Sequence, residues 1–129
     1  MAISYIVIAV VFGKLAYVHV HAQASDASAD LPTISPDEYD DFISEYPHSD
    51  IEPVDVHVQA VPDDITDVVV VCEFGKLTHV KSFTSHTAAA AWAAATNSKQ
   101  LDDQAVHMFY ERHPQSDVPV LDVVIYKLK

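Results

Sequence analysis

The histidines and carboxylates of this chain are its candidates for metal binding. His19 and His21 are two residues apart in an alternating segment, so on a strand both side chains project from one face. His57 stands in a second alternating segment and could join them, because imidazoles with a carboxylate can bind zinc or another transition metal. The same positions are also the polar half of a half-buried strand, which is the simpler interpretation. We therefore expect no metal and no cofactor.

Signs of catalysis are few. Cys72 follows Val71 in an apolar run, where a thiol is usually an inert core residue. The chain contains no G-x-S-x-G or H-E-x-x-H motif. Its two glycines, Gly13 and Gly75, lie 62 positions apart and cannot build a glycine-rich phosphate loop. We expect a protein that is not an enzyme and has no catalytic residue.

Acidic residues give the strongest signal. Between Leu15 and Gly75 the chain has fourteen Asp and Glu residues and no Lys or Arg. Residues 1–66 carry twelve acids and one base, and residues 67–129 carry seven acids and six bases, so net charges of −11 and −1 make up the total of −12. A one-sided field attracts basic partners and repels nucleic acid and anionic membranes.

The densest group of acidic residues lies on an expected helix. Ser35 is a good N-cap, Pro36 suits the first helical position, and Glu38 completes a capping box. Four apolar residues then follow at helical spacing from Tyr39 onward, before Pro47 ends the helix. The rest of the helix surface carries five carboxylates: Asp37, Glu38, Asp40, Asp41 and Glu45.

An internal repeat organises the elements. The tetrapeptide Phe12–Leu15 recurs as Phe74–Leu77, each time between two strand-like runs, and we expect a two-residue hairpin with glycine first in a type II′ turn. The apolar start of the chain, followed by Ala22-Gln23-Ala24, also has features of a signal peptide. Because the equivalent segment of the second copy forms a hairpin, we interpret the first as a hairpin too.

The repeat is expected to continue beyond the hairpins. Thr84 or Ser85 should cap a second helix that ends near Ala95 and uses Trp92 as its anchor. Strands are expected at 54–61 and 105–112, since Val-His recurs in both, with a last strand at 120–126. On this alignment the first copy has about twelve extra residues near 23–34.

The expected fold is α+β: two tandem ββαβ repeats form a mainly antiparallel sheet of seven strands, counting a C-terminal strand, with two helices packed on one face. We expect one domain, 1–129, made of an acidic repeat (1–66) and a nearly neutral repeat (67–129). The unbroken apolar runs 5–11 and 68–71 are expected to be central strands, buried on both faces.

Carboxylates spaced along a rigid helix can imitate a phosphate backbone. We therefore expect a small cytoplasmic inhibitor, of the phage or plasmid anti-defence type, that mimics nucleic acid. It would occupy the basic groove of a DNA- or RNA-binding protein, without binding nucleic acid or membrane itself. Around the helix, the expected rim of the partner-binding surface is Asp26, Asp30, Asp50 and Glu52.

Three alternatives stay open. The acid could be an ordinary solvated face or an adaptation to salt, although the nearly neutral second half weakens the latter. The protein could be a non-catalytic assembly protein that forms a homodimer through an open sheet edge. It could also be a metal-binding enzyme that uses His19, His21 and His57.

Overall fold

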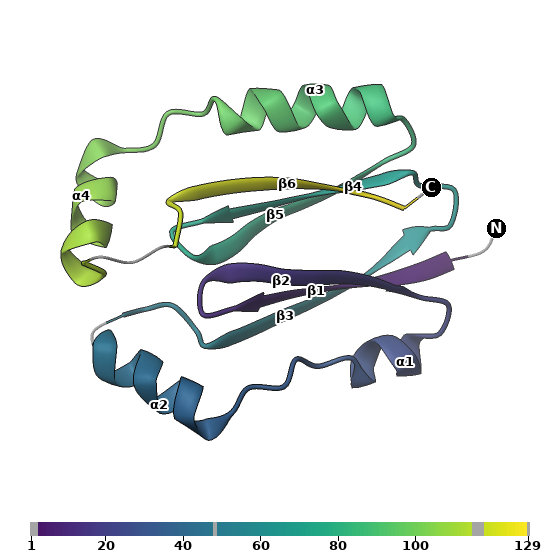
Figure 1. Ribbon diagram of the computed structural model, residues 1–129. Helices are drawn as coiled ribbons and strands as arrows, with labels where there is room; N and C mark the ends of the chain where they lie inside the picture. The colour runs from purple at the N-terminus through teal and green to yellow at the C-terminus, as the bar shows by residue number, and fades with distance from the viewer. Residues whose placement is uncertain (1–2, 48, 115–117, 129) are drawn as a thin grey trace.

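Two three-stranded antiparallel sheets, each built from one half of the chain, form the centre of the molecule (Figure 1). The computed structural model describes residues 3–47, 49–114 and 118–128. The first half supplies β1 (Ile3–Val11), β2 (Lys14–His21), α1 (Ala24–Ala29), α2 (Pro36–Glu45) and β3 (Val54–Pro62). The second half supplies β4 (Asp67–Glu73), β5 (Lys76–Phe83), α3 (His86–Asn97), α4 (Asp103–Arg112) and β6 (Leu121–Lys127). The strand orders are β2-β1-β3 and β5-β4-β6.

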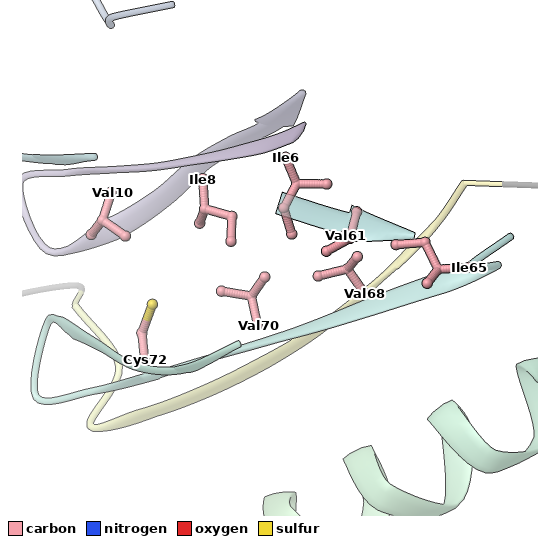
Figure 2. Close-up of a cluster of buried hydrophobic side chains, with 8 residues drawn as sticks. All are labelled: Ile6, Ile8, Val10, Val61, Ile65, Val68, Val70 and Cys72. Atoms are coloured by element: carbon pink, nitrogen blue, oxygen red, sulfur yellow. The ribbon is translucent and has the colours of Figure 1, made fainter. Parts of the chain in front are cut away.

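The main core lies between the two sheets, which pack face to face (Figure 2). It consists of eight buried side chains: Ile6, Ile8, Val10, Val61, Ile65, Val68, Val70 and Cys72. The central strands β1 and β4 are buried on both faces, as predicted, because each also has a covered outer face. Figure 1 shows α1 and α2 outside the first sheet, α3 outside the second, and α4 at one end.

Each half repeats the order ββααβ. From the first hairpin to the start of the first helix, equivalent residues are 62 positions apart, as Lys14 and Lys76 show. From the second helix to the last strand they are 67 apart, as Pro36 and Asp103 show. Strand register repeats too, because Val7 pairs with Val58 and Val69 with Ile125. Residues within these two blocks therefore have identifiable equivalents in the other copy.

The α+β class and the two ββαβ-like units are confirmed, but three details of the prediction are wrong. The strands form two sheets rather than one, and helices cover both outer faces. Residues 105–112 belong to helix α4, which Asp102 caps by accepting a hydrogen bond from the Gln104 N–H. The second copy is five residues longer between hairpin and second helix, not twelve shorter, and residues 23–34 contain α1.

Both hairpin loops are Phe-Gly rather than Gly-Lys. Val11 pairs with Lys14, so Phe12 and Gly13 are the two loop residues, with φ of 51° and 81°. The second loop repeats this, with φ of 55° at Phe74 and 78° at Gly75. Positive φ at both central positions defines a type I′ turn, so the expected type II′ turn is wrong.

Aromatic contacts hold the two strained phenylalanines. The left-handed conformation costs a non-glycine residue about 1–2 kcal/mol. Phe12 packs on Phe42 of α2 with ring centroids 5.1 Å apart, and Phe74 packs on Phe109 of α4 at 5.7 Å. Each hairpin tip is thereby joined to the second helix of its own copy, and this contact positions α2.

Candidate functional site

Helix α2, the predicted acidic helix, forms as the sequence indicates. The Ser35 hydroxyl oxygen accepts a hydrogen bond from the Glu38 N–H at 3.1 Å, and Pro36 occupies the first turn. Phe42 contacts Phe12 of the hairpin and Tyr46, with which it makes an edge contact at 5.5 Å. These contacts fix one side of α2 and leave the acidic side outward.

The expected apolar stripe of α2 is only partly covered. Phe42 and Tyr46 are half-buried, whereas Tyr39 and Ile43 are 47% and 43% exposed. No residue of α2 is fully buried. The helix therefore presents two large apolar side chains to solvent together with its carboxylates.

All five carboxylates of α2 are exposed, and we call them the acidic helix face: Asp37, Glu38, Asp40, Asp41 and Glu45. Within the described residues, none of them forms an ion pair, and the last turn contains no basic residue. Three of them, Asp37, Asp41 and Glu45, repeat every four residues, so they stand about 6 Å apart along the axis. Like charges at this spacing destabilise a helix by about 0.2–0.5 kcal/mol per pair.

The equivalent helix α4 has no acidic residue at the five corresponding positions. At an offset of 67 residues, the five acidic positions correspond to Gln104, Ala105, His107, Met108 and Arg112. Helix α4 ends on Arg112, which suits the negative end of the helix dipole, whereas α2 ends on Glu45, which does not. The fold thus forms with or without carboxylates at these positions.

The four predicted rim acids have different surroundings. Asp26 and Glu52 are exposed. Asp50 forms an ion pair with Lys76 at 2.9 Å, and this hydrogen bond lowers the pKa of Asp50. Asp30 is only 13% exposed and binds side chains of β2. Two of the four acids are therefore engaged within the chain.

Asp30 lies at the C-terminal end of α1, among side chains from one face of β2. Its Oδ2 accepts from His19 Nδ1 at 2.8 Å and from His21 Nε2 at 2.7 Å, and its Oδ1 accepts from the Tyr17 hydroxyl at 3.0 Å. The hydrogen bond from His21 is the largest cause that lowers the pKa of Asp30 to about 2, against the opposing effect of burial. We call Tyr17, His19, His21 and Asp30 the β2 cluster.

His57 does not join this cluster, so that part of the metal alternative is wrong. His19 pairs with Val7 on β1, whereas His57 pairs with Ile8, and neighbouring residues of a strand point to opposite faces. Sequence reasoning missed Asp30 as the third member because it placed no helix at 24–29, and α1 is what brings Asp30 back over β2.

A buried carboxylate lies in the second copy. Asp67 is fully buried, and its Oδ1 accepts from Thr66 at 2.5 Å and from His86 Nδ1 at 2.7 Å. Within the described residues its Oδ2 has no hydrogen-bond partner. Burial opposes the charge, but the bonds from Thr66 and His86 outweigh it and hold the pKa of Asp67 below its ordinary value.

A cleft of about 410 Å³ separates α4 from the β4–β5 hairpin. Phe74, Met108 and Phe109 supply apolar surface, and Lys76 and Arg112 lie among its charged residues. Its volume is at the lower end of the range for small-molecule sites.

Cys72 is part of the core between the sheets. It is 3% exposed, and burial raises the pKa of its thiol to about 11. The thiolate needed for nucleophilic attack is therefore scarce at neutral pH, which agrees with the interpretation of Cys72 as a packing residue.

No protein-family model, curated protein or solved structure matches the chain. Among the described helices, none has both the length and the apolar character required to cross a bilayer.

Proposed function

We propose that the protein binds stoichiometrically, through the acidic helix face, to the basic surface of a nucleic-acid-binding protein, and blocks nucleic acid from that surface. In this proposal it is an inhibitor of the anti-defence type that acts in the cytoplasm and catalyses no reaction. The surface comprises the five carboxylates of α2, with Asp26 and Glu52 at its rim. Asp30 and Asp50 are left out because they are engaged within the chain.

The comparison of α2 with α4 supports this proposal most. Two helices occupy equivalent places, and only one carries carboxylates at all five positions. The dipole favours Asp37 and Glu38 in the first turn of α2, but Glu45 lies at its unfavourable end, and carboxylates four residues apart repel one another. A feature that the fold does not need, and that weakens the helix bearing it, is best explained by a partner of opposite charge.

Tyr39 and Ile43 favour a protein as that partner. They are about half exposed on the same helix as the five carboxylates. Interfaces between proteins are enriched in tyrosine and bury apolar side chains inside a polar rim. A merely solvated face would need neither residue.

Retention of a partner from lysate at low salt tests the proposal. The wild type is compared with the triple variant Asp37→Lys, Asp40→Lys and Asp41→Lys. The matched control is Asp64→Lys, Asp103→Lys and Glu111→Lys, which changes the net charge equally at exposed positions outside α2. We expect the wild type and the control to retain the same nucleic-acid-binding protein, and the α2 variant to lose it.

Competition with nucleic acid then distinguishes a nucleic-acid mimic from a protein that binds its partner through acidic residues at some other surface. The retained protein should be released by its own nucleic acid and by moderate salt, because phosphate-binding grooves depend steeply on salt. Equal retention by all three chains would contradict the proposal, and so would a partner that binds nucleic acid and this protein together.

A further inference from the structure

The β2 cluster brings three metal-binding side chains to one point. Ligand atoms of His19, His21 and Asp30 all lie within 4.8 Å of one another. Two come from alternate residues of β2, whose side chains share a face, and Asp30 comes from the end of α1. Two imidazoles and one carboxylate are a donor set that suits zinc and related transition metals rather than magnesium or calcium.

The distances between the imidazole nitrogens and the Asp30 oxygen are slightly shorter than those around a bound zinc ion. Each imidazole nitrogen now lies 2.7–2.8 Å from the same Asp30 oxygen. A tetrahedral zinc ion with bonds of about 2.0–2.2 Å holds its ligand atoms about 3.3 Å apart, so each nitrogen needs to move only about half an ångström away from the Asp30 oxygen. A neutral imidazole directs its lone pair at the ion by moving its proton to the other ring nitrogen.

Tyr17 supports the arrangement from outside the ligand set. Its hydroxyl donates to the Asp30 oxygen that the histidines do not use, and its ring stacks on His19 with centroids 4.0 Å apart. Such contacts orient metal ligands and raise their affinity. The His19 side chain is 51% exposed, so solvent reaches the cluster from that side.

The second copy shows that the fold does not require this cluster. At an offset of 62 residues, His19, His21 and Asp30 correspond to Lys81, Phe83 and Trp92. There Trp92 packs on Phe83 with centroids 6.0 Å apart, and the Lys81 ammonium lies 5.4 Å from the Trp92 ring. One copy thus covers its sheet with aromatic packing, as predicted for Trp92, while the other places metal-ligand side chains at the same three positions.

We propose that His19, His21 and Asp30 form a site for one Zn²⁺ ion, with Tyr17 as a positioning residue and with a coordination position open to solvent. Three protein ligands and an open position are the arrangement of exchangeable and catalytic zinc sites rather than of closed structural ones. This site lies apart from the acidic helix face and does not depend on the proposed inhibitor function.

Zinc titration of the chelator-treated full chain tests the proposal. We expect the wild type to bind one equivalent of Zn²⁺, to reject Mg²⁺, and to melt at a higher temperature as zinc is added. The variants His21→Ala and Asp30→Asn should lose this binding. The controls His57→Ala and Asp26→Asn, which change a histidine on the other face and an exposed acid, should keep it.

Tyr17→Phe provides a graded readout. We expect zinc affinity about 10–100-fold lower than in the wild type, with the stoichiometry unchanged. Co²⁺ bound to the wild type should show the visible absorption of a low-coordinate nitrogen and oxygen site, and the ligand variants should lack it.

Two results would overturn the proposal: a wild type that binds no zinc, or ligand variants that bind it as well as the controls do. Should His21→Ala fail to fold, His19→Ala replaces it, since that side chain is half exposed and its loss leaves no buried gap. Circular dichroism of each variant without metal establishes that the comparison is between folded proteins.

Discussion

The two copies of the ββααβ unit share strand order, register and hairpin conformation, yet they differ where they face solvent. In the first copy the second helix is acidic and the outer face of the sheet carries the β2 cluster. In the second copy the equivalent helix has no acidic residue at the five corresponding positions, and the equivalent cluster is built on aromatic packing. The features that both copies share are those that the fold needs. The features that differ between the copies are not needed for folding, and function should be sought among them.

Equivalent phenylalanines at the end of the sandwich should differ most in their effect on stability. Phe109 is 6% exposed, whereas Phe42 is half-buried. We expect Phe109→Ala to lower the free energy of unfolding by about 3–5 kcal/mol and Phe42→Ala by about half as much, because a full cavity forms only at Phe109. Chemical denaturation measures both, and equal losses would mean that the two helices are packed alike.

Substitution of the two loop glycines should also destabilise the protein more in the second copy than in the first. A Cβ at Gly75 would lie 2.7 Å from Ile51 Cδ1, whereas a Cβ at Gly13 would meet its nearest side-chain atom at 3.2 Å. Positive φ costs alanine about 1–2 kcal/mol at either site. Overpacking at Gly75 should add about 1 kcal/mol or more. Thermal melting of Gly75→Ala and Gly13→Ala checks the order, and a larger loss at Gly13 would contradict it.

Asp67 should give the second copy a pH dependence that Tyr5, its equivalent, cannot give the first. The folded-state pKa of Asp67 is lowered, so its contribution to stability is present above the ordinary value near 3.8 and is lost as pH falls below it. We expect Asp67→Asn to melt below the wild type at neutral pH, and the difference to shrink in acid. A difference that is constant with pH would show that the charge is unimportant.

Charge exchange at the last residue of each second helix should have the smallest effect. Glu45→Arg removes a repulsion and suits the helix dipole, so it should stabilise the protein by about 0.3–1 kcal/mol. Arg112→Glu should destabilise it by a similar amount. Destabilisation by Glu45→Arg would mean that repulsion among its carboxylates does not weaken α2.

Local signals in the sequence predicted much of this fold. The apolar runs of β1 and β4, the Ser35 cap and the strand 54–61 are encoded by neighbouring residues, and the structure contains them. Two sheets instead of one could not be foreseen, because a strand buried on both faces looks the same under a helix or under a second sheet. Helix α4 was missed because Val106-His107 resembles Val56-His57 of β3. Its apolar spacing and its Asp102 cap were the better guide.

The acidic helix face was predictable because its residues are neighbours in sequence and share one helix. The β2 cluster was not, because it depends on α1 returning Asp30 to a strand that precedes it in the chain. The face of the first sheet on which each histidine lies follows from the register of β2 and β3 against β1, which no local pattern specifies.

Exchanging the surface of α2 for that of α4 tests whether the carboxylates of α2 bind a partner. Five substitutions give α2 the residues of α4 at the equivalent positions: Asp37→Gln, Glu38→Ala, Asp40→His, Asp41→Met and Glu45→Arg. The quantity to measure is the amount of nucleic-acid-binding protein retained from lysate, relative to the wild type, once an unchanged fold has been established by circular dichroism. We predict a folded protein that retains no such partner. Undiminished retention would contradict the proposed function, because the carboxylates of α2 would then be an ordinary solvated face.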